Sequence, residues 1–134
     1  MRNVENEELV VQFFKAMGTT FSEMRVAFEA YLADDCVWQN SGSPTLRGKK
    51  EIMRALEAFH DSIGLEDVGG EFLAIASVGD KVLTERHERW TGKDGAVLLA
   101  SLPLMGTFEV RGGRIYAWRD YFAPPTINAT FARP

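Results

Sequence analysis

One carboxylate stands in the middle of an aromatic, strand-like segment, RIYAWRDYFAP, residues 114–124. Alternate residues of a strand point to the same side. One face of this segment is therefore expected to carry Tyr116, Trp118, Asp120 and Phe122. A lone charge on such a face is costly to bury unless it is paired. Asp120 therefore requires either a buried cation as its partner or a chemical role.

The segment LTERHERW, residues 83–90, supplies a matching set of polar groups. By the same alternation, Arg86 and Glu88 share a face with Trp90, whereas the opposite face is mostly charged. In VWQN, Trp38 and Asn40 share a face if the strand stays extended that far. The presence of Trp38 and Trp90 on these faces indicates that the faces point into the protein. We therefore expect one arginine, two carboxylates and one amide to meet in an apolar hollow.

Such a set suits the opening of a strained ether ring by water. The water needs a base and the departing oxygen needs an acid, and two carboxyl groups fill both roles if their environments separate their proton affinities. An arginine between them can hold one ionised, and the pair then titrates as a unit. An asparagine can hold the water. This chemistry calls for no metal ion and no cofactor, and two histidines and one cysteine are too few for a clustered metal site.

Composition narrows the class of protein. The chain of 134 residues suits one domain spanning residues 1–134, and its 46% hydrophobic and 25% charged residues are typical of a globular protein. A net charge of −4 argues against nucleic acid as a partner. The sequence contains no apolar run of membrane-spanning length, and a single cysteine fits a reducing compartment. We expect a cytoplasmic protein that binds neither nucleic acid nor membrane.

The period of the apolar residues changes halfway along the chain. Helical spacing predicts helices at about residues 6–17, within 18–35 and at 49–63, the last closed by Gly64. β-rich runs follow at 71–78, 81–90, 96–110 and 114–122, separated by short turns that contain glycine. The prediction is an α+β fold. It has a cone-shaped, strongly curved, mainly antiparallel sheet, with three helices in the N-terminal half enclosing an apolar pocket.

LTERHERW, VWQN and WRDYF resemble the corresponding segments of the limonene-1,2-epoxide hydrolase family. That family shares its cone fold with nuclear transport factor 2, ketosteroid isomerase and SnoaL-like polyketide cyclases. The resemblance implies that Asp120 is the base that deprotonates water, that Arg86 bridges the carboxylates and that Asn40 helps to hold the water. Glu88 stands where the family has an aspartate acid, and Trp38 where it has a water-holding tyrosine. These two departures alter the site.

The remaining pocket wall is expected to be apolar and to favour an apolar, cyclic or terpenoid epoxide. The residues predicted to line it are Trp90, Trp118, Phe122, Leu98 and Met105. The segment LLASLPLM, residues 98–105, is apolar on both alternating faces. A strand covered on both sides has this pattern, so we expect a second subunit to cover the side away from the pocket and form a homodimer.

Other interpretations fit the same residues. Arg86, Glu88 and Asp120 can form an ion-pair network that only braces the sheet, Asn40 can cap the turn after it, and any of the tryptophans can be core. A ketosteroid-isomerase-like or polyketide-cyclase-like enzyme would use Asp120 to move a carbon-bound proton. A non-catalytic cone domain would only bind a small molecule.

Overall fold

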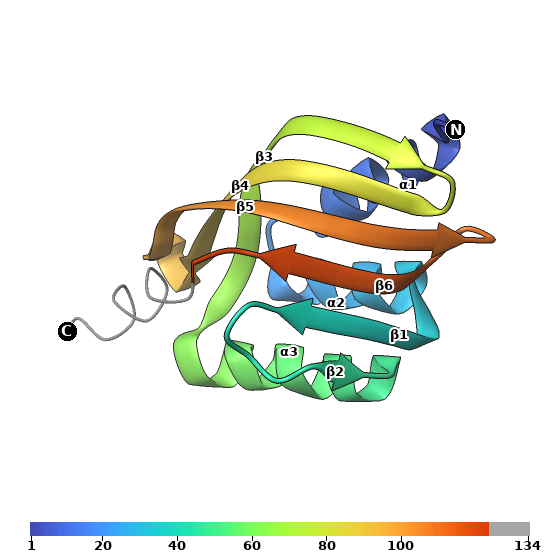
Figure 1. Cartoon of the computed structure of the whole chain (residues 1–134). Helices are drawn as coiled ribbons and strands as arrows, with labels where there is room; N and C mark the ends of the chain where they lie inside the picture. Colours follow the sequence, from blue (N-terminus) through green and yellow to red (C-terminus); the bar gives the residue numbers. More distant parts are fainter. Residues whose placement is uncertain (124–134) are drawn as a thin grey trace.

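A computed structural model of the chain describes residues 1–123. Three α-helices pack against one face of a six-stranded sheet with the strand order β2-β1-β6-β5-β4-β3 (Figure 1). β1 runs parallel to β6, and every other neighbouring pair is antiparallel. This arrangement confirms the predicted α+β class with a mainly antiparallel sheet.

The helices begin and end where the sequence supplies caps. In α1 (Val4–Ala16), the Asn3 side chain accepts from the Asn6 N–H, and in α2 (Phe21–Tyr31) Thr20 does the same for Glu23. α3 (Lys49–Ile63) ends at Gly64, whose φ of 71° is the left-handed conformation that favours glycine. The large buried apolar residues of these helices recur at helical spacing and face the sheet: Val10, Phe13, Met24, Phe28, Ile52 and Leu56.

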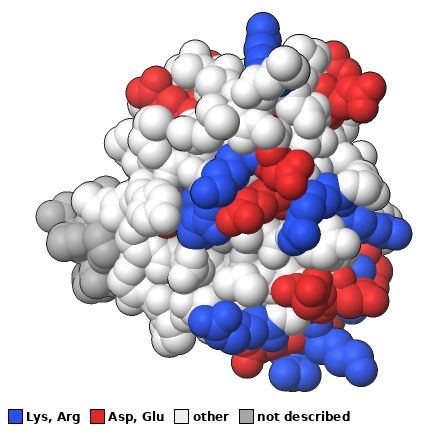
Figure 2. Space-filling view, turned by 45° about the vertical axis from the view of Figure 1, so that its right-hand side comes forward, with Lys and Arg blue, Asp and Glu red and all other residues white. Residues whose placement is uncertain are grey.

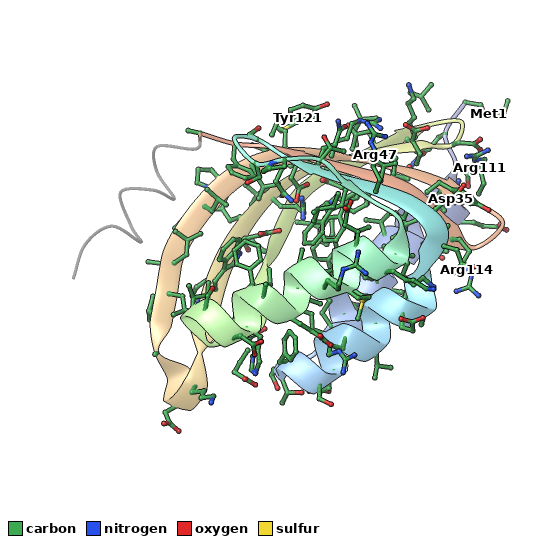
Figure 3. All side chains as sticks on the ribbon, turned by 90° about the horizontal axis from the view of Figure 1, so that it is seen from below. Met1, Asp35, Arg47, Arg111, Arg114 and Tyr121 are labelled. Carbon is green, nitrogen blue, oxygen red and sulfur yellow. The ribbon has the colours of Figure 1, made fainter. Side chains whose placement is uncertain are left out.

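The strands differ greatly in length. β1 (Leu32–Asn40) and the short β2 (Leu46–Arg47) form one edge, and β3 (Leu65–Val78) forms the other. Between them lie β4 (Lys81–Gly92), β5 (Val97–Arg111) and β6 (Arg114–Tyr121), with a short 3-10 turn, η1 (Lys93–Gly95), joining β4 to β5. The long strands bend around the helices, which lie on the concave side of the sheet (Figure 3).

Two strands begin earlier than the sequence pattern predicts. β1 starts at Leu32 rather than at the VWQN segment, and β3 starts at Leu65 rather than at 71. In β3, Gly69 and Gly70 lie inside the strand rather than before it. A side chain at Gly70 would come within 1.9 Å of the His87 carbonyl oxygen, so glycine lets β3 stay paired with β4 at Glu88.

A bulge in β6 changes which aromatic residue is buried. The register with β5 shifts between Glu109 and Val110, so Ile115 lies in the core, fully buried. Tyr116 is half-buried, and the Arg111 guanidinium lies 4.4 Å from the centroid of its ring. Tyr116 therefore does not share the environment of Trp118 and Asp120, as plain alternation had predicted.

The buried side chains form two clusters. The larger fills the space between helices and sheet around Phe13, Phe28, Phe108 and Trp118. The smaller consists of Leu99, Leu102 and Leu104 on β5, with Trp90 and Phe122 packed against it. Within residues 1–123, no helix is both long enough and apolar enough to span a membrane.

Candidate active site

Alternation along β4 sends its functional side chains to the concave face of the sheet. Thr84, Arg86 and Glu88 are 1%, 2% and 8% exposed, whereas Glu85 and His87 between them are exposed. Arg86 is the largest side chain in the fully buried group. A buried guanidinium of this kind needs anionic partners on the same face.

Because β5 has a glycine at position 106, the Arg86 side chain on β4 can contact an anionic partner on β6, across the intervening β5. Gly106 is aligned with Thr84 on one side and with Asp120 of β6 on the other. A Cβ atom at Gly106 would lie 2.2 Å from Asp120 Oδ1 and 2.7 Å from Arg86 Nη2. The Arg86–Asp120 ion pair therefore occupies the space that a side chain at position 106 would fill.

Arg86 bridges the two carboxylates with different nitrogens. Its Nη2 donates to Asp120 Oδ1, and its Nη1 donates to Glu88 Oε2 at 2.8 Å. Its Nε donates to the Thr84 hydroxyl at 3.2 Å, which in turn donates to the Gly106 carbonyl oxygen at 2.9 Å. The fork of the guanidinium fixes both carboxyl groups relative to each other.

Aromatic rings hold the guanidinium plane in place. The Arg86 Cζ atom lies 4.7 Å from the ring centroid of Phe14 on α1 and 5.4 Å from that of Phe108 on β5. These cation–π contacts, together with the exclusion of water, strengthen the ion pairs and restrict their geometry.

The two carboxyl groups have different surroundings. Glu88 accepts from Arg86 on Oε2 and from Trp90 Nε1 on Oε1, the latter at 3.1 Å. Burial raises the pKa of Asp120 to about 7; the Arg86 charge opposes this rise, and the Glu88 charge adds to it. Asp120 thus holds or loses a proton near neutral pH, as a group engaged in proton transfer must.

The parallel pairing of β1 with β6 brings Trp38 and Asn40 beside the ion pairs. Asn40 is aligned with Asp120, and Trp38 with Trp118. The two indole rings are stacked with centroids 4.7 Å apart. The Trp118 indole N–H lies close enough to Asp120 to lower the pKa of that carboxyl group, whereas the buried Trp38 Nε1 has no hydrogen-bond partner among the described residues. The turn that follows uses the Asn40 main-chain carbonyl, which accepts from the Ser43 N–H. Turn formation therefore does not consume the Asn40 side chain.

The family sequence model for the limonene-1,2-epoxide hydrolase catalytic domain matches residues 4–133, nearly the whole chain. The chain belongs to the limonene-1,2-epoxide hydrolase family. Epoxide hydrolase EphG of Mycobacterium tuberculosis is 34% identical to it over 98 residues, which are 70% of this chain and 59% of the relative. The chain thus spans under two thirds of that relative's length.

Solved structures agree with the family. An M. tuberculosis epoxide hydrolase described as similar to limonene-epoxide hydrolase superposes with a TM-score of 0.75 at 28% identity, covering 97% of this chain and 86% of that one. A putative SnoaL-like polyketide cyclase from Jannaschia sp. also superposes with a TM-score of 0.75, at 13% identity, covering 98% and 94% of the two chains. The second likeness shows the shared cone fold alone.

The residues predicted to line a pocket have several locations in this family member. Trp118 is 3% exposed and belongs to the main core, whereas Leu98 is half-buried against that core. Trp90 and Phe122 are half-buried beside the small leucine cluster. The prediction for Met105 is wrong: it is 52% exposed on the opposite face. The reason is that Leu104 lies opposite Arg86 and faces inward, so its neighbour Met105 must face outward.

Sequence reasoning missed several parts of this site. Thr84 was detectable, because it alternates with Arg86 on the same strand. Gly106 gave no such signal, because its importance depends on the register of three strands. Phe14, Phe108 and the bond from Trp90 to Glu88 likewise follow from packing rather than from spacing along the chain.

Proposed function

We propose that this protein is an epoxide hydrolase that adds water to an apolar epoxide, cyclic or terpenoid, by one-step general acid–base catalysis. The observation that carries the proposal is the buried bridge of Arg86 between Asp120 and Glu88. It gives two carboxyl groups of unequal surroundings, on separate strands and held by one cation. A reaction that removes one proton and delivers another at the same time requires such a pair of carboxyl groups.

In the proposed reaction, Asp120 is the base and Glu88 the acid. Asp120 removes a proton from water while the water oxygen bonds to an epoxide carbon. The carbon–oxygen bond of the ring breaks, and its oxygen takes the proton of Glu88. The product is a vicinal diol, and one proton must return from Asp120 to Glu88 before the next turnover. Asn40 and the Trp38 indole N–H are the groups proposed to orient the water, with no covalent intermediate.

The proposed substrate class follows from the small leucine cluster beside Glu88. Leu102 is aligned with Glu88 in the sheet, and Leu99, Leu104, Trp90 and Phe122 surround it. The three leucines are themselves buried, so an apolar ring would bury its surface mainly against the half-buried Trp90 and Phe122, at about 25 cal/mol per Å². Polar substrates would gain nothing there, so we expect a preference for hydrocarbon epoxides.

The direct test is hydrolysis of cyclic, terpenoid and styrene-type epoxides in ¹⁸O-labelled water, with Asp120→Asn as the variant. One ¹⁸O atom is expected in the diol from the first turnover, because water attacks without an enzyme ester. The variant keeps the size of the side chain but cannot take a proton, so kcat is expected to fall by at least about 10²-fold. An unlabelled first turnover, or an unaffected Asp120→Asn enzyme, contradicts the proposal.

The rate of hydrolysis is expected to depend on pH. Hydrolysis needs one proton on the carboxyl pair, and the raised pKa of Asp120, about 7, sets where that proton is lost. The value of kcat/KM is therefore expected to decline as the pH rises through about 7.

A second candidate function is a carbon-acid reaction of the isomerase or cyclase type. It is favoured by the same pKa of about 7, which suits a base that removes a carbon-bound proton, and by Trp38, which cannot accept a hydrogen bond from water. Exchange of solvent deuterium into a candidate ketone separates the two functions, because epoxide opening requires no such exchange.

We propose a homodimer through the convex face of the sheet. Leu83, Met105 and Tyr121 lie on β4, β5 and β6 and are 42%, 52% and 56% exposed. Tyr121 projects from the side of the sheet away from the helices (Figure 3). A hollow of about 230 Å³ near these residues is lined by Glu85, Arg86, Pro103, Leu104, Met105 and Tyr121. A second copy is the proposed occupant, because exposed apolar side chains beside a hollow suit self-association.

Sedimentation measurements test the dimer. Met105→Lys is expected to give a monomer at micromolar concentration, because it places a charge inside the interface. The matched control is Val78→Lys at the distal end of β3, also an exposed apolar residue, at 66% exposure. A monomeric native chain would contradict the proposal.

Nucleic acid and membranes are not proposed as partners. Side chains of both signs are interleaved on the face shown in Figure 2, without the single-sign basic patch that nucleic acid binding requires. Cys36 is a free, buried thiol, in keeping with the proposed cytoplasmic location.

A further inference from the structure

Ser41, the residue directly after β1, makes hydrogen bonds with the chain on both sides of Tyr121. The ends of β1 and β6 lie side by side (Figure 1). The Ser41 N–H donates to the Asp120 carbonyl oxygen at 3.1 Å. The Ser41 hydroxyl accepts from the Phe122 N–H at 3.2 Å and donates to the Asp120 carbonyl oxygen at 3.4 Å. One short side chain therefore joins the end of β1 to the segment that carries Asp120.

The hydroxyl takes the place of a main-chain group of the parallel ladder. In a parallel pair of strands, a residue that donates its N–H to the neighbouring strand also accepts the next bond through its own carbonyl. In this register the Phe122 N–H would donate to the Ser41 carbonyl. The chain instead turns at Gly42, whose φ is 80°, and the hydroxyl accepts from the Phe122 N–H. β1 thus ends directly after Asn40 while the end of β6 stays paired.

The turn after β1 does not need the hydroxyl of Ser41. It is closed between main-chain groups, because the Ser43 N–H donates to the Asn40 carbonyl oxygen at 3.0 Å. Ser41 is half-buried, whereas Ser43 is exposed. The hydroxyl of Ser41 is therefore free to bind β6, and its removal would take a partner from the partly buried Phe122 N–H.

Phe122 is the residue that this bond fixes in place. It lies directly after the end of β6, and it packs against the three buried leucines of β5. Asp120 lies two residues earlier, within β6, and alternation places the two side chains on the same face. The bond from Ser41 therefore sets the position of the proposed apolar wall relative to the proposed base.

We propose that Ser41 is a positioning residue of the hydrolase site: its hydroxyl holds Phe122 where an apolar epoxide binds with its ring against this side chain and its carbon near the water at Asp120. This inference rests on the proposed function. Ser41 touches no reacting atom and acts through Phe122. Its main-chain bond to Asp120 does not depend on the hydroxyl, so loss of the hydroxyl is expected to weaken substrate binding more than proton transfer.

The experiment compares Ser41→Ala, which removes the hydroxyl, with Ser41→Thr, which keeps one. Hydrogen exchange of the Phe122 amide is followed by NMR in the full chain without substrate. It is expected to become at least about threefold faster in Ser41→Ala and to return to the native rate in Ser41→Thr. With cyclohexene oxide as the substrate, Ser41→Ala is expected to raise KM about three- to tenfold, a change of the order of one hydrogen bond, and to change kcat by less than about twofold. Ser41→Thr is expected to restore KM.

The matched control is Ser43→Ala, in the same turn. Ser43 is exposed, and its bond in the turn comes from its main-chain N–H, so exchange at Phe122 and KM are expected to stay at their native values. The inference is overturned if Ser41→Ala leaves the Phe122 amide or KM unchanged, or if Ser43→Ala has the same effect. A chain that shows the expected exchange but hydrolyses no epoxide would contradict the proposed function and not the bond between Ser41 and Phe122.

Discussion

Gly106→Ala is expected to lower kcat/KM for epoxide hydrolysis by about 10²-fold or more while the chain still folds. The new methyl group would lie 2.2 Å from Asp120 Oδ1 and 2.7 Å from Arg86 Nη2, so it must separate the ion pair. These atoms are the ends of flexible side chains, whereas the nearest main-chain atom, the Arg119 carbonyl oxygen, is 3.3 Å away. The clash therefore disturbs the site rather than the sheet, and a displacement of about 1 Å at reacting groups costs about 10²-fold in rate.

Two measurements check this prediction. Steady-state kinetics gives the loss of kcat/KM, and a ¹³C titration gives the pKa of Asp120. Because Arg86 lowers that pKa in the native site, moving Arg86 away is expected to raise it above about 7. The titration does not depend on finding a substrate.

Gly69→Ala is the matched control. A Cβ atom there meets nothing closer than 3.7 Å, which is ordinary van der Waals contact. The same glycine-to-alanine change in another strand of the sheet is therefore expected to leave both the rate and the titration unchanged. Equal effects of the two substitutions would show that Gly106 has no particular relation to the ion pair.

The contrast between Gly106 and Arg86 shows which parts of the site can be predicted from the sequence and which cannot. Arg86, Glu88 and Asp120 could be assigned to one face because alternation along a strand is a local rule, and aromatic neighbours mark the inward side. The fold class followed from the change of period between the helical half and the strand half. Both inferences need only residues close together in the chain.

What the sequence did not reveal depends on how distant segments are aligned. The role of Gly106 requires the register of β4, β5 and β6 together. Met105 is assigned to the wrong face because apolar residues occupy both alternating sets of LLASLPLM, so polarity does not mark the inward set. Tyr116 is misassigned for a different reason, the bulge in β6. Bulges shift alternation by one residue, and nothing in a short segment states that a bulge is present.

Arg86→Met is expected to abolish hydrolysis and to destabilise the fold by about 3–5 kcal/mol at pH 8, because it removes the cation between two buried carboxyl groups. The side chain of methionine fills much of the same space, so the loss measures the charge and its hydrogen bonds rather than a cavity. Urea unfolding between pH 5.5 and pH 8 gives the free energy of unfolding.

The pH dependence of this destabilisation has a definite sign. The folded-state pKa of Asp120 is raised to about 7, so its contribution to stability is largest at low pH and is lost as the pH rises through that value. Without Arg86, which lowers this pKa, the folded protein would hold the proton still more tightly. The difference in stability between the native chain and Arg86→Met is therefore expected to grow from pH 5.5 to pH 8.

Arg119→Met separates this effect from the general loss of an arginine ion pair. Arg119 Nη1 lies 2.7 Å from Glu109 Oε2, but on the convex face, and both side chains are partly exposed to water. Because solvent screens such a pair, its loss is expected to cost less than about 1 kcal/mol, with little change between the two pH values. If both substitutions cost the same, Arg86 would be an ordinary structural arginine. A large and pH-dependent cost at Arg86 alone would instead mark a site in which two carboxyl groups are kept close, against their mutual repulsion, by a single buried cation.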